Sequence, residues 1–227
     1  MRFFDIKTNI IPRVDPNCDS ISESLKLLNK FRNNNIIKIC STPNYFDLEN
    51  KNINEIVINI QKEASKLENF EIPEIYTSTL YPINTDLIGL DEIISINNSR
   101  FLICKFPNYG IPRNYLEKLK YFVNNNYIPI LTNIENSQIK IKSINELIEI
   151  GCFFDIDINN FFNFKTKTSI KYIKYMENKN SILTISGFNK LENFNNNFEK
   201  FSKQTKIDLD KLKKIYCWEN PNLIISS

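Results

Sequence analysis

Carboxylates are the side chains of this sequence whose spacing best suits chemistry. Asp155 and Asp157 are two residues apart in a run that reads as a β-strand, so they point to the same face. Glu135 follows a neighbouring predicted strand, and Asp15 follows the first one. Such oxygens suit a Mg²⁺ ion or a general acid–base pair. A simpler interpretation, which we favour, is that one carboxylate caps a helix and another neutralises a lysine.

The sequence contains no histidine. Imidazole is the commonest ligand for transition metals and the usual proton carrier near neutral pH, so Ser-His and Cys-His mechanisms are excluded. The four glycines form neither a P-loop nor a dinucleotide fingerprint. The five cysteines are widely spaced and odd in number, which favours reduced thiols in the core over a disulfide framework or a zinc site.

Short apolar runs alternate with amphipathic segments along the chain. Strands are predicted at residues 3–6, 36–40, 74–77, 101–104, 128–131, 152–156 and 182–185. Helices are predicted at residues 20–32, 53–67, 112–123, 144–150, 168–176 and 191–216. Repeated strand–helix–strand units favour parallel strands enclosed by helices, and seven of them favour a closed α/β barrel. An open doubly wound sheet is the alternative.

The composition predicts one globular domain over residues 1–227. Hydrophobic residues make up 42% of the chain, and no Pro/Gly/Ser-rich segment interrupts it. The net charge of +3 comes from interspersed signs, which argues against nucleic-acid binding. Because no apolar run approaches the roughly 20 residues that span a bilayer, we expect no membrane span and a cytoplasmic location.

The predicted loops that follow the strands carry a series of short motifs. They read DIKTNIIPRVD at residues 5–15, STPNY at 41–45, FLICKFP at 101–107, IPILTNIEN at 128–136, ISGFN at 185–189 and NP at 220–221. In order and spacing, these motifs resemble the polymerase and histidinol phosphatase (PHP) superfamily, specifically its capsule-type bacterial manganese-dependent tyrosine phosphatases. The resemblance covers nearly the whole chain and implies a distorted TIM-like (βα)7 barrel of the PHP type.

The resemblance also locates the metal positions of the family, whose motifs are DIHxHILPGIDDG, A/C-TPH, EFP, PILxHPER and SDxH. The histidine positions of the family motifs correspond to Lys7, Asn9, Asn44, Asn133 and Asn189 in this sequence. Its acidic ligands fall on Lys105, Gly187 and Leu80, and the arginine of PER falls on Asn136. An ammonium repels a divalent cation and neutral amides bind it weakly, so we predict that this chain holds neither metal nor cofactor.

Two explanations of these changes remain open. Lys7 and Lys105 can occupy the place of the lost metal ions, supply positive charge there and pair with Glu135, Asp15 or Asp157. Alternatively, the asparagines are turns and backbone caps left after catalysis was lost, and both lysines extend from the barrel mouth into water.

We therefore interpret the sequence as a catalytically inactive phosphatase homologue, a pseudoenzyme that serves as a binding or scaffold subunit for a protein partner or a larger assembly. The predicted contacts to a phosphorylated or acidic ligand are Lys7, Arg13, Lys105 and Lys190. The alternative is a surviving tyrosine phosphatase or other phosphoesterase that uses Asp15, Glu135 and Asp157 around Mg²⁺.

Overall fold

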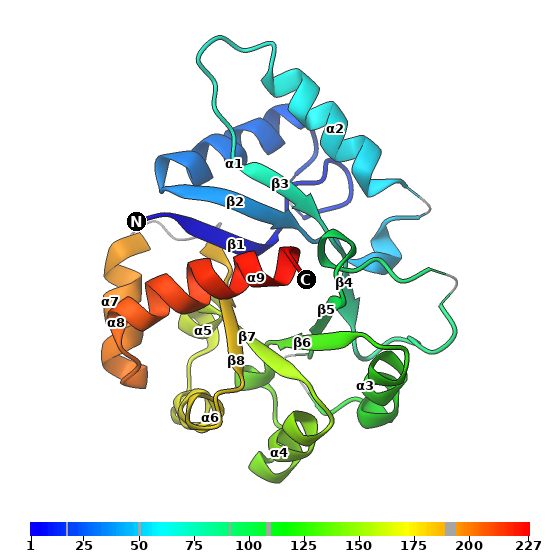
Figure 1. Ribbon diagram of the computed structural model, residues 1–227, viewed down its shortest axis with the longest axis vertical. Helices are drawn as coiled ribbons and strands as arrows, with labels where there is room; N and C mark the ends of the chain where they lie inside the picture. The colour runs from blue at the N-terminus through cyan, green and yellow to red at the C-terminus, as the bar shows by residue number, and fades with distance from the viewer. Residues whose placement is uncertain (17, 50, 91, 108–109, 189–193) are drawn as a thin grey trace.

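The computed structural model describes residues 1–16, 18–49, 51–90, 92–107, 110–188 and 194–227. Within these residues, parallel strands surround a central core and helices surround the strands (Figure 1). The strands are β1 (Phe3–Thr8), β2 (Ile36–Ser41), β3 (Glu74–Thr77), β4 (Leu80–Pro82), β5 (Phe101–Lys105), β6 (Ile128–Thr132), β7 (Phe153–Asp157) and β8 (Ile182–Ser186). They form two sheets, in the orders β1-β2-β3 and β4-β5-β6-β7-β8. The chain therefore adopts the predicted α/β barrel rather than an open doubly wound sheet.

Two seams join the sheets. At the first seam, Asn44 and Leu80 form an isolated parallel bridge. At the second, β1 and β8 lie side by side but do not pair as strands within the described residues. There the carboxylate of Asp5 accepts the N–H groups of Gly187 and Phe188 at 3.2 and 2.8 Å. A side chain thus closes the barrel where a ladder of backbone bonds would otherwise do so.

Strand β4 is an addition to the seven predicted strands. It has only three residues and ends at Pro82, so its sequence reads as a loop. Proline cannot donate a hydrogen bond to a neighbouring strand, but β4 is the edge of its sheet and pairs there with β5 alone. The edge position explains why the fold tolerates Pro82.

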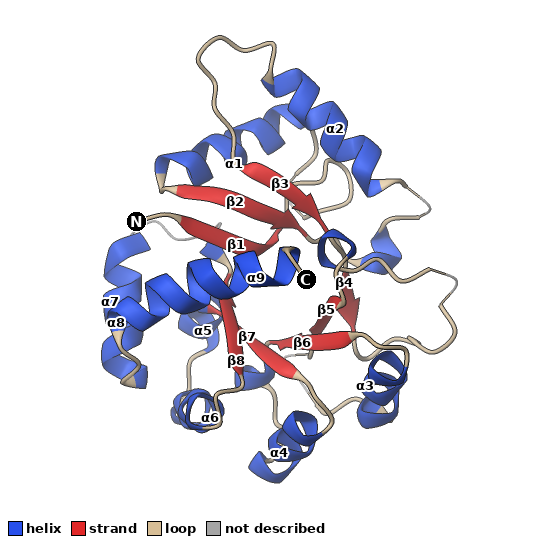
Figure 2. Ribbon diagram, viewed as in Figure 1, coloured by secondary structure: helices blue, strands red, loops and turns tan. Residues whose placement is uncertain are grey.

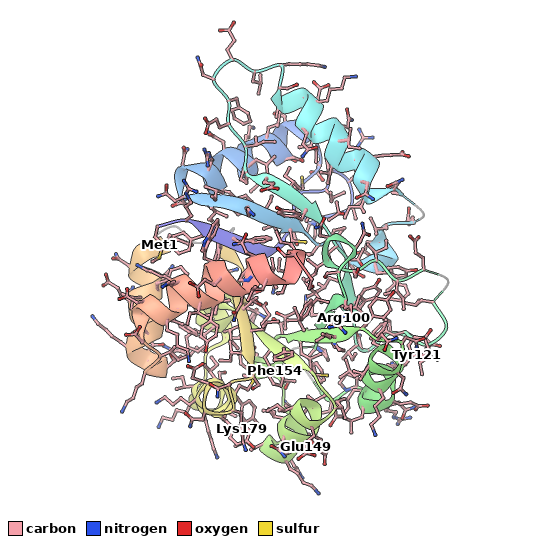
Figure 3. The ribbon with its side chains drawn as sticks, viewed as in Figure 1. Met1, Arg100, Tyr121, Glu149, Phe154 and Lys179 are labelled. Carbon is pink, nitrogen blue, oxygen red and sulfur yellow. The ribbon has the colours of Figure 1, made fainter. Side chains whose placement is uncertain are left out.

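Helices cover the outside of the strands (Figure 2). They are α1 (Ile21–Asn33), α2 (Ile53–Ala64), α3 (Tyr115–Asn124), α4 (Ile141–Glu149), α5 (Ile158–Phe164), α6 (Lys167–Asn178), α7 (Phe194–Thr205), α8 (Leu209–Lys211) and α9 (Asn220–Ile225), with 3-10 turns η1 (Tyr45–Asp47), η2 (Ile96–Asn98) and η3 (Ile134–Asn136) and a π-helical segment, η5 (Leu212–Glu219). Charged side chains such as Glu149 and Lys179 project outward near the ends of α4 and α6 (Figure 3). No helix in the described part of the chain is long and apolar enough to cross a membrane.

Apart from shifts in helix ends, two predicted segments differ from the structure. The sequence predicts a loop over residues 157–162, whereas α5 begins at Ile158 because the Asp157 side chain caps it. The sequence also predicts one helix over residues 191–216, of which 191–193 lie outside the described residues. In the rest, α7 ends at Thr205, and Lys206 follows with a left-handed φ of 63°. A new helical run then continues through η5 and α9.

The C-terminal run closes the end of the barrel at which the strands begin (Figure 1). One buried cluster joins α9 to four strands through Phe4, Cys40, Ile103, Ile130 and Ile224. Opposing strands of a barrel can touch only inside it, so this cluster is the interior core. Asn220 Nδ2 also donates to the Leu183 carbonyl, near the start of β8, at 2.8 Å. A solvent-accessible site therefore lies at the opposite end, where the strands finish. The five cysteines are buried and unpaired, as predicted.

Candidate functional site

A cavity of about 400 Å³ lies at the mouth of the barrel. Its walls come from β4 and from the loops that follow β1, β2 and β5. It includes five positions that the sequence singles out: Asn9, Asp15, Asn44, Leu80 and Lys105. The fold therefore brings residues from distant parts of the sequence into one site, as a parallel barrel requires.

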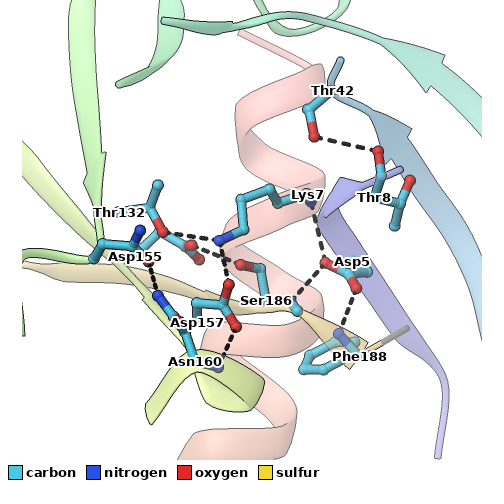
Figure 4. A network of polar contacts seen from close by, with 12 residues as sticks. Asp5, Lys7, Thr8, Thr42, Thr132, Asp155, Asp157, Asn160, Ser186 and Phe188 are labelled. Carbon is cyan, nitrogen blue, oxygen red and sulfur yellow. Dashed lines mark hydrogen bonds and ion pairs between the residues drawn. The ribbon is translucent and has the colours of Figure 1, made fainter. Parts of the chain in front are cut away.

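Lys7 extends from β1 across the barrel toward β6 and β7 (Figure 4). Its Nζ lies 2.6 Å from Asp157 Oδ2 and 3.0 Å from Thr132 Oγ1. The Lys7 side chain is 11% exposed and that of Asp157 is 15% exposed, so the ion pair is largely shielded from water. The predicted pairing of Lys7 with Asp157 is confirmed, and the alternative that Lys7 extends into water is wrong.

The neighbours of Lys7 keep it charged. Burial alone would lower the pKa of Lys7, but the attraction of Asp157 and Asp155 raises it above its ordinary value. A protonated ammonium has no lone pair, so in this form Lys7 acts neither as a nucleophile nor as a metal ligand. It is an internal cation at the end of β1.

Asp157 and Asp155 both have structural partners. Asp157 Oδ1 accepts the Asn160 N–H at 2.9 Å and so caps α5. The simpler interpretation of the sequence assigns capping and lysine neutralisation to two carboxylates, whereas Asp157 alone performs both. Asp155 accepts hydrogen bonds from the hydroxyls of Thr184 and Ser186 at 2.9 and 2.6 Å. Burial raises the pKa of Asp155, although Lys7 opposes this shift.

Asp5 is a buried carboxylate for which the sequence predicts no role. It accepts backbone N–H groups from Lys7, Gly187 and Phe188. Burial raises the pKa of Asp5 to about 7, against the lowering effect of these bonds. The signal that marks Asp5 in the sequence is a single carboxylate between apolar residues of one strand.

Gly187 follows β8 at a position to which the resemblance assigns an acidic ligand. Its φ is +83°, in the left-handed region that favours glycine. A Cβ atom on Gly187 would lie 2.2 Å from Asp157 Oδ1. The carboxylate of Asp157 therefore fills the space that a side chain at position 187 needs.

Two asparagines at the histidine positions support the backbone. Asn44 caps η1, where its Oδ1 accepts a backbone N–H at 3.2 Å. Asn133 is buried in a left-handed conformation with φ of 68°, and its Oδ1 accepts a hydrogen bond from the Asn160 side chain. These two residues fit the turn-and-cap explanation. Asn9 lines the mouth cavity, and Asn189 lies outside the described residues.

The three carboxylates of the Mg²⁺ alternative lie in different surroundings. Asp15 Oδ2 accepts the Ile11 N–H at 2.7 Å, and burial raises the pKa of Asp15 to about 7. Glu135 lies beside a separate cavity, and Asp157 binds Lys7. Across the described ranges, no three Asp, Glu or Cys side chains form a group that could hold a metal ion. The residues that the structure describes therefore do not fit a catalytic metal centre.

The predicted anion contacts do not form one cluster. Lys105 lines the mouth cavity, and its Nζ has no hydrogen-bond or ion-pair partner among the residues that the structure describes. Burial and the charge of Lys7 lower the pKa of Lys105. Arg13 lines a different cavity, of about 700 Å³, between α1 and α2. Lys190 lies outside the described residues.

The parallel barrel, with its site at the carboxyl ends of the strands, places this chain in the class of TIM-like α/β barrels. Residues 3–211 match the family model described as "Capsular polysaccharide synthesis, CpsB/CapC". The chain therefore belongs to the CpsB/CapC family, which confirms the resemblance. CapC of Staphylococcus aureus, a provisionally named tyrosine-protein phosphatase, is 30% identical over 183 residues, which cover 74% of this chain and 71% of that protein.

Two solved structures share the fold. A chain from the work on the metal-dependent tyrosine phosphatases YwqE from Bacillus subtilis and CpsB from Streptococcus pneumoniae superposes with a TM-score of 0.77 at 17% identity. The match covers 98% of this chain and 94% of the other. The phosphotriesterase homology protein from Escherichia coli, solved with phosphate in its active site, gives a TM-score of 0.61 at 10% identity over 99% of this chain and 98% of its own. At these identities the similarity concerns the barrel fold alone.

Proposed function

We propose that this chain is a non-hydrolysing member of the CpsB/CapC family, a pseudoenzyme whose barrel mouth binds a partner instead of cleaving a phosphate ester. The position of the Lys7 ammonium, 2.6 Å from Asp157 inside the barrel, carries this proposal. A divalent cation at that carboxylate would be repelled by a fixed positive charge in a poorly solvated space. The sequence has no histidine, and the described residues of the mouth form no group of ligands that could hold a metal ion and so prepare a water molecule for attack.

The proposed ligand is a phosphorylated or acidic group on a protein partner in the cytoplasm. Lys105 supplies an ammonium without a partner among the described residues, and the amides of Asn9 and Asn44 supply neutral donors in the same cavity. Asp15 and Asp47 also line this cavity. Their charges would repel an anion, so the anionic group is expected to bind on the Lys105 side.

Hydrolysis and metal content test whether the chain is an enzyme. We expect the purified protein, supplied in turn with Mn²⁺, Fe²⁺ and Mg²⁺, to cleave neither p-nitrophenyl phosphate nor a phosphotyrosine peptide. Elemental analysis should find far less than stoichiometric metal. Hydrolysis that disappears in the Asp157→Asn and Glu135→Gln variants would overturn the proposal and favour the Mg²⁺ alternative.

Calorimetric titration tests the ligand class separately. A phosphotyrosine peptide should bind more tightly than its unphosphorylated form. Lys105→Gln should weaken this binding at least about tenfold, because a charge-assisted hydrogen bond is lost. Lys171→Gln, at an exposed lysine of α6, is the matched control and should bind normally. Equal affinity for the two peptides would contradict the ligand class without affecting the hydrolysis result.

A further inference from the structure

Lys105 is an accessible amine at the mouth of the barrel. It is the last residue of β5, and it lines the mouth cavity of about 400 Å³. The residue is exposed, so molecules from solution can reach it. Its Nζ has no hydrogen-bond or ion-pair partner within the described part of the chain. The amine is therefore available to a molecule that enters the cavity.

The strand register places Lys105 close to the ammonium of Lys7. Lys105 of β5 pairs with Thr132 of β6, so the two side chains point to the same face. Ile103 and Ile130 precede them by two residues and belong to the interior cluster, so this face is the inside of the barrel. Thr132 Oγ1 accepts a hydrogen bond from Lys7 Nζ at 3.0 Å (Figure 4). The two lysine side chains therefore share one end of the barrel interior.

The two lysines differ in their counter-charges. Asp157 pairs with Lys7 and keeps it protonated, whereas Lys105 has no ion pair with the residues that the structure describes. When two like charges share a cavity, the less stabilised one loses its proton more readily. Partial burial and the charge of Lys7 lower the pKa of Lys105, and the charge of Asp157 opposes this shift only in part. Lys105 therefore holds more free amine near neutral pH than an ordinary lysine does.

These surroundings suit the chemistry of a reactive lysine. A neutral amine has a lone pair that can attack a carbonyl carbon. Partial burial and a neighbouring cation are two means by which proteins activate a lysine for Schiff-base formation. Lys105 has both. It also lies at the carboxyl end of a strand in a parallel barrel, which is where such barrels place their reactive groups.

The walls of the cavity indicate the kind of carbonyl compound that fits. The negative charges of Asp15 and Asp47 disfavour an anionic substrate for the neutral amine. The amides of Asn9 and Asn84 line the cavity and can form hydrogen bonds with hydroxyl groups, while Phe106 adds an apolar surface. The volume of about 400 Å³ lies near the lower end for ligand pockets. These features suit a small, uncharged hydroxyaldehyde.

We propose that the Lys105 amine forms a Schiff base with a small hydroxyaldehyde held in the cavity at the barrel mouth. The nitrogen lone pair attacks the carbonyl carbon, and the electrons of the C=O π bond move to oxygen. A proton passes from nitrogen to oxygen and gives a carbinolamine. Loss of the hydroxyl group and of the remaining nitrogen proton as water leaves a C=N bond, and neither an oxidant nor a reductant is needed.

This inference goes beyond the proposed function and does not rest on it. The Schiff base forms from the neutral amine of Lys105, whereas the proposed anion binding uses its ammonium form. A lowered pKa brings both forms of the side chain into the range near neutral pH.

Reductive trapping with glyceraldehyde tests the proposal on the unaltered protein. Sodium cyanoborohydride reduces a Schiff base to a stable secondary amine, which mass spectrometry of peptides locates. At neutral pH, Lys105 should be labelled at least about fivefold faster than Lys171, an exposed lysine of α6. The rate at Lys105 should also level off as the glyceraldehyde concentration rises, because the aldehyde binds in the cavity before it reacts. Equal rates at the two lysines would overturn the proposal.

Matched variants and the pH dependence distinguish a reactive site from general labelling of surface amines. Lys105→Arg keeps the positive charge and should remove the fast, saturable part of the labelling, whereas Lys171→Arg should retain it. In the unaltered protein, labelling of Lys105 should rise with pH through a lower midpoint than labelling of Lys171. A saturable phase that persists in Lys105→Arg, or equal midpoints, would contradict the assignment. Because these measurements involve no phosphate, their failure would leave the tests of the proposed function unaffected.

Discussion

The Lys7–Asp157 ion pair makes the barrel interior sensitive to the loss of either charge. Lys7→Met leaves Asp157 as a buried carboxylate without its cation, so the free energy of unfolding should fall by about 3–5 kcal/mol. Urea denaturation measures this change. The double variant Lys7→Met/Asp157→Asn removes both charges and should recover most of the stability. A loss below about 1 kcal/mol in the single variant would indicate a solvent-screened pair and contradict the shielded geometry.

Glu135 gives folding a pH dependence opposite to that of a salt-bridged carboxylate. Burial raises the pKa of Glu135 from 4.5 to about 8; Asp157 and Asp155 add to the rise and Lys7 reduces it. The folded state therefore holds the Glu135 proton more tightly. The protonated Glu135 side chain thus contributes its full stabilisation of the folded state below pH 4.5, and this contribution is lost as the pH rises through 8.

The Glu135→Gln variant isolates this effect. The variant should exceed the unaltered protein in Tm by at least about 2 °C at pH 8.5. At about pH 4.5 the two proteins should unfold at nearly the same temperature. Scanning calorimetry across this range gives the comparison. An advantage of the variant that shrinks as the pH rises would contradict the assigned pKa direction.

Individual site residues differ in how far the sequence predicts them. The pairing of Lys7 with Asp157 is predictable because a parallel barrel brings the ends of its strands together. The position of Arg13 is not predictable, because it depends on a loop in which Arg13 itself adopts a left-handed φ of 59°. The role of Asp5 depends on two backbone N–H groups of a distant turn, to which no sequence pattern points.

At the scale of elements, the Asp5 carboxylate supplies hydrogen bonds across the β1–β8 seam. Asp5→Ala removes the acceptor for the Gly187 and Phe188 N–H groups, so their hydrogen exchange should accelerate at least about tenfold. The amide of Leu131, in the ladder between β5, β6 and β7, provides an internal reference. Mass spectrometry or NMR follows both regions. An equal acceleration at Leu131 would indicate global destabilisation and contradict a local closing role for Asp5.

The C-terminal helix α9 offers an adjacent pair of residues for a matched comparison. Ile224 is 1% exposed and belongs to the interior cluster, whereas Leu223 is 67% exposed. Ile224→Ala should cost about 2–5 kcal/mol in the free energy of unfolding, and Leu223→Ala should stay within about 0.5 kcal/mol. Chemical denaturation measures both. Similar losses in the two variants would contradict the sealing of the barrel by this helix face.

Elements with strong apolar patterns are predictable, and those set by single contacts are not. Most of the seven predicted strands appear because runs rich in Ile, Leu and Phe fit strands that are covered on both faces, whereas β3, with the sequence EIYT, is only partly buried. The start of α3 moves from residue 112 to Tyr115, because Asn114 takes a left-handed φ of 56° before the helix. Strand β4 and helix α5 depend on tertiary pairing and on a side-chain cap, which periodicity does not reveal.

At the scale of the whole molecule, the two ends of the chain are tied to one core. Phe4 of β1 and Ile224 of α9 share the interior cluster, and Trp218 packs against it. Residues 1–227 should therefore unfold as one cooperative unit, as the sequence predicts. Urea transitions followed by Trp218 fluorescence and by far-UV circular dichroism should coincide. Separate midpoints would contradict a single domain.

Gly187 has a consequence for the evolution of this chain. Where hydrolysis has been lost as proposed, a mutation that returned an acidic side chain to position 187 would first produce a collision with Asp157. Replacing Asp157 first would leave the buried ammonium of Lys7 without its ion-pair partner. Reversal requires coordinated changes at all three positions, and each single step is harmful. Selection can therefore refine a binding function at this site more readily than it can restore hydrolysis.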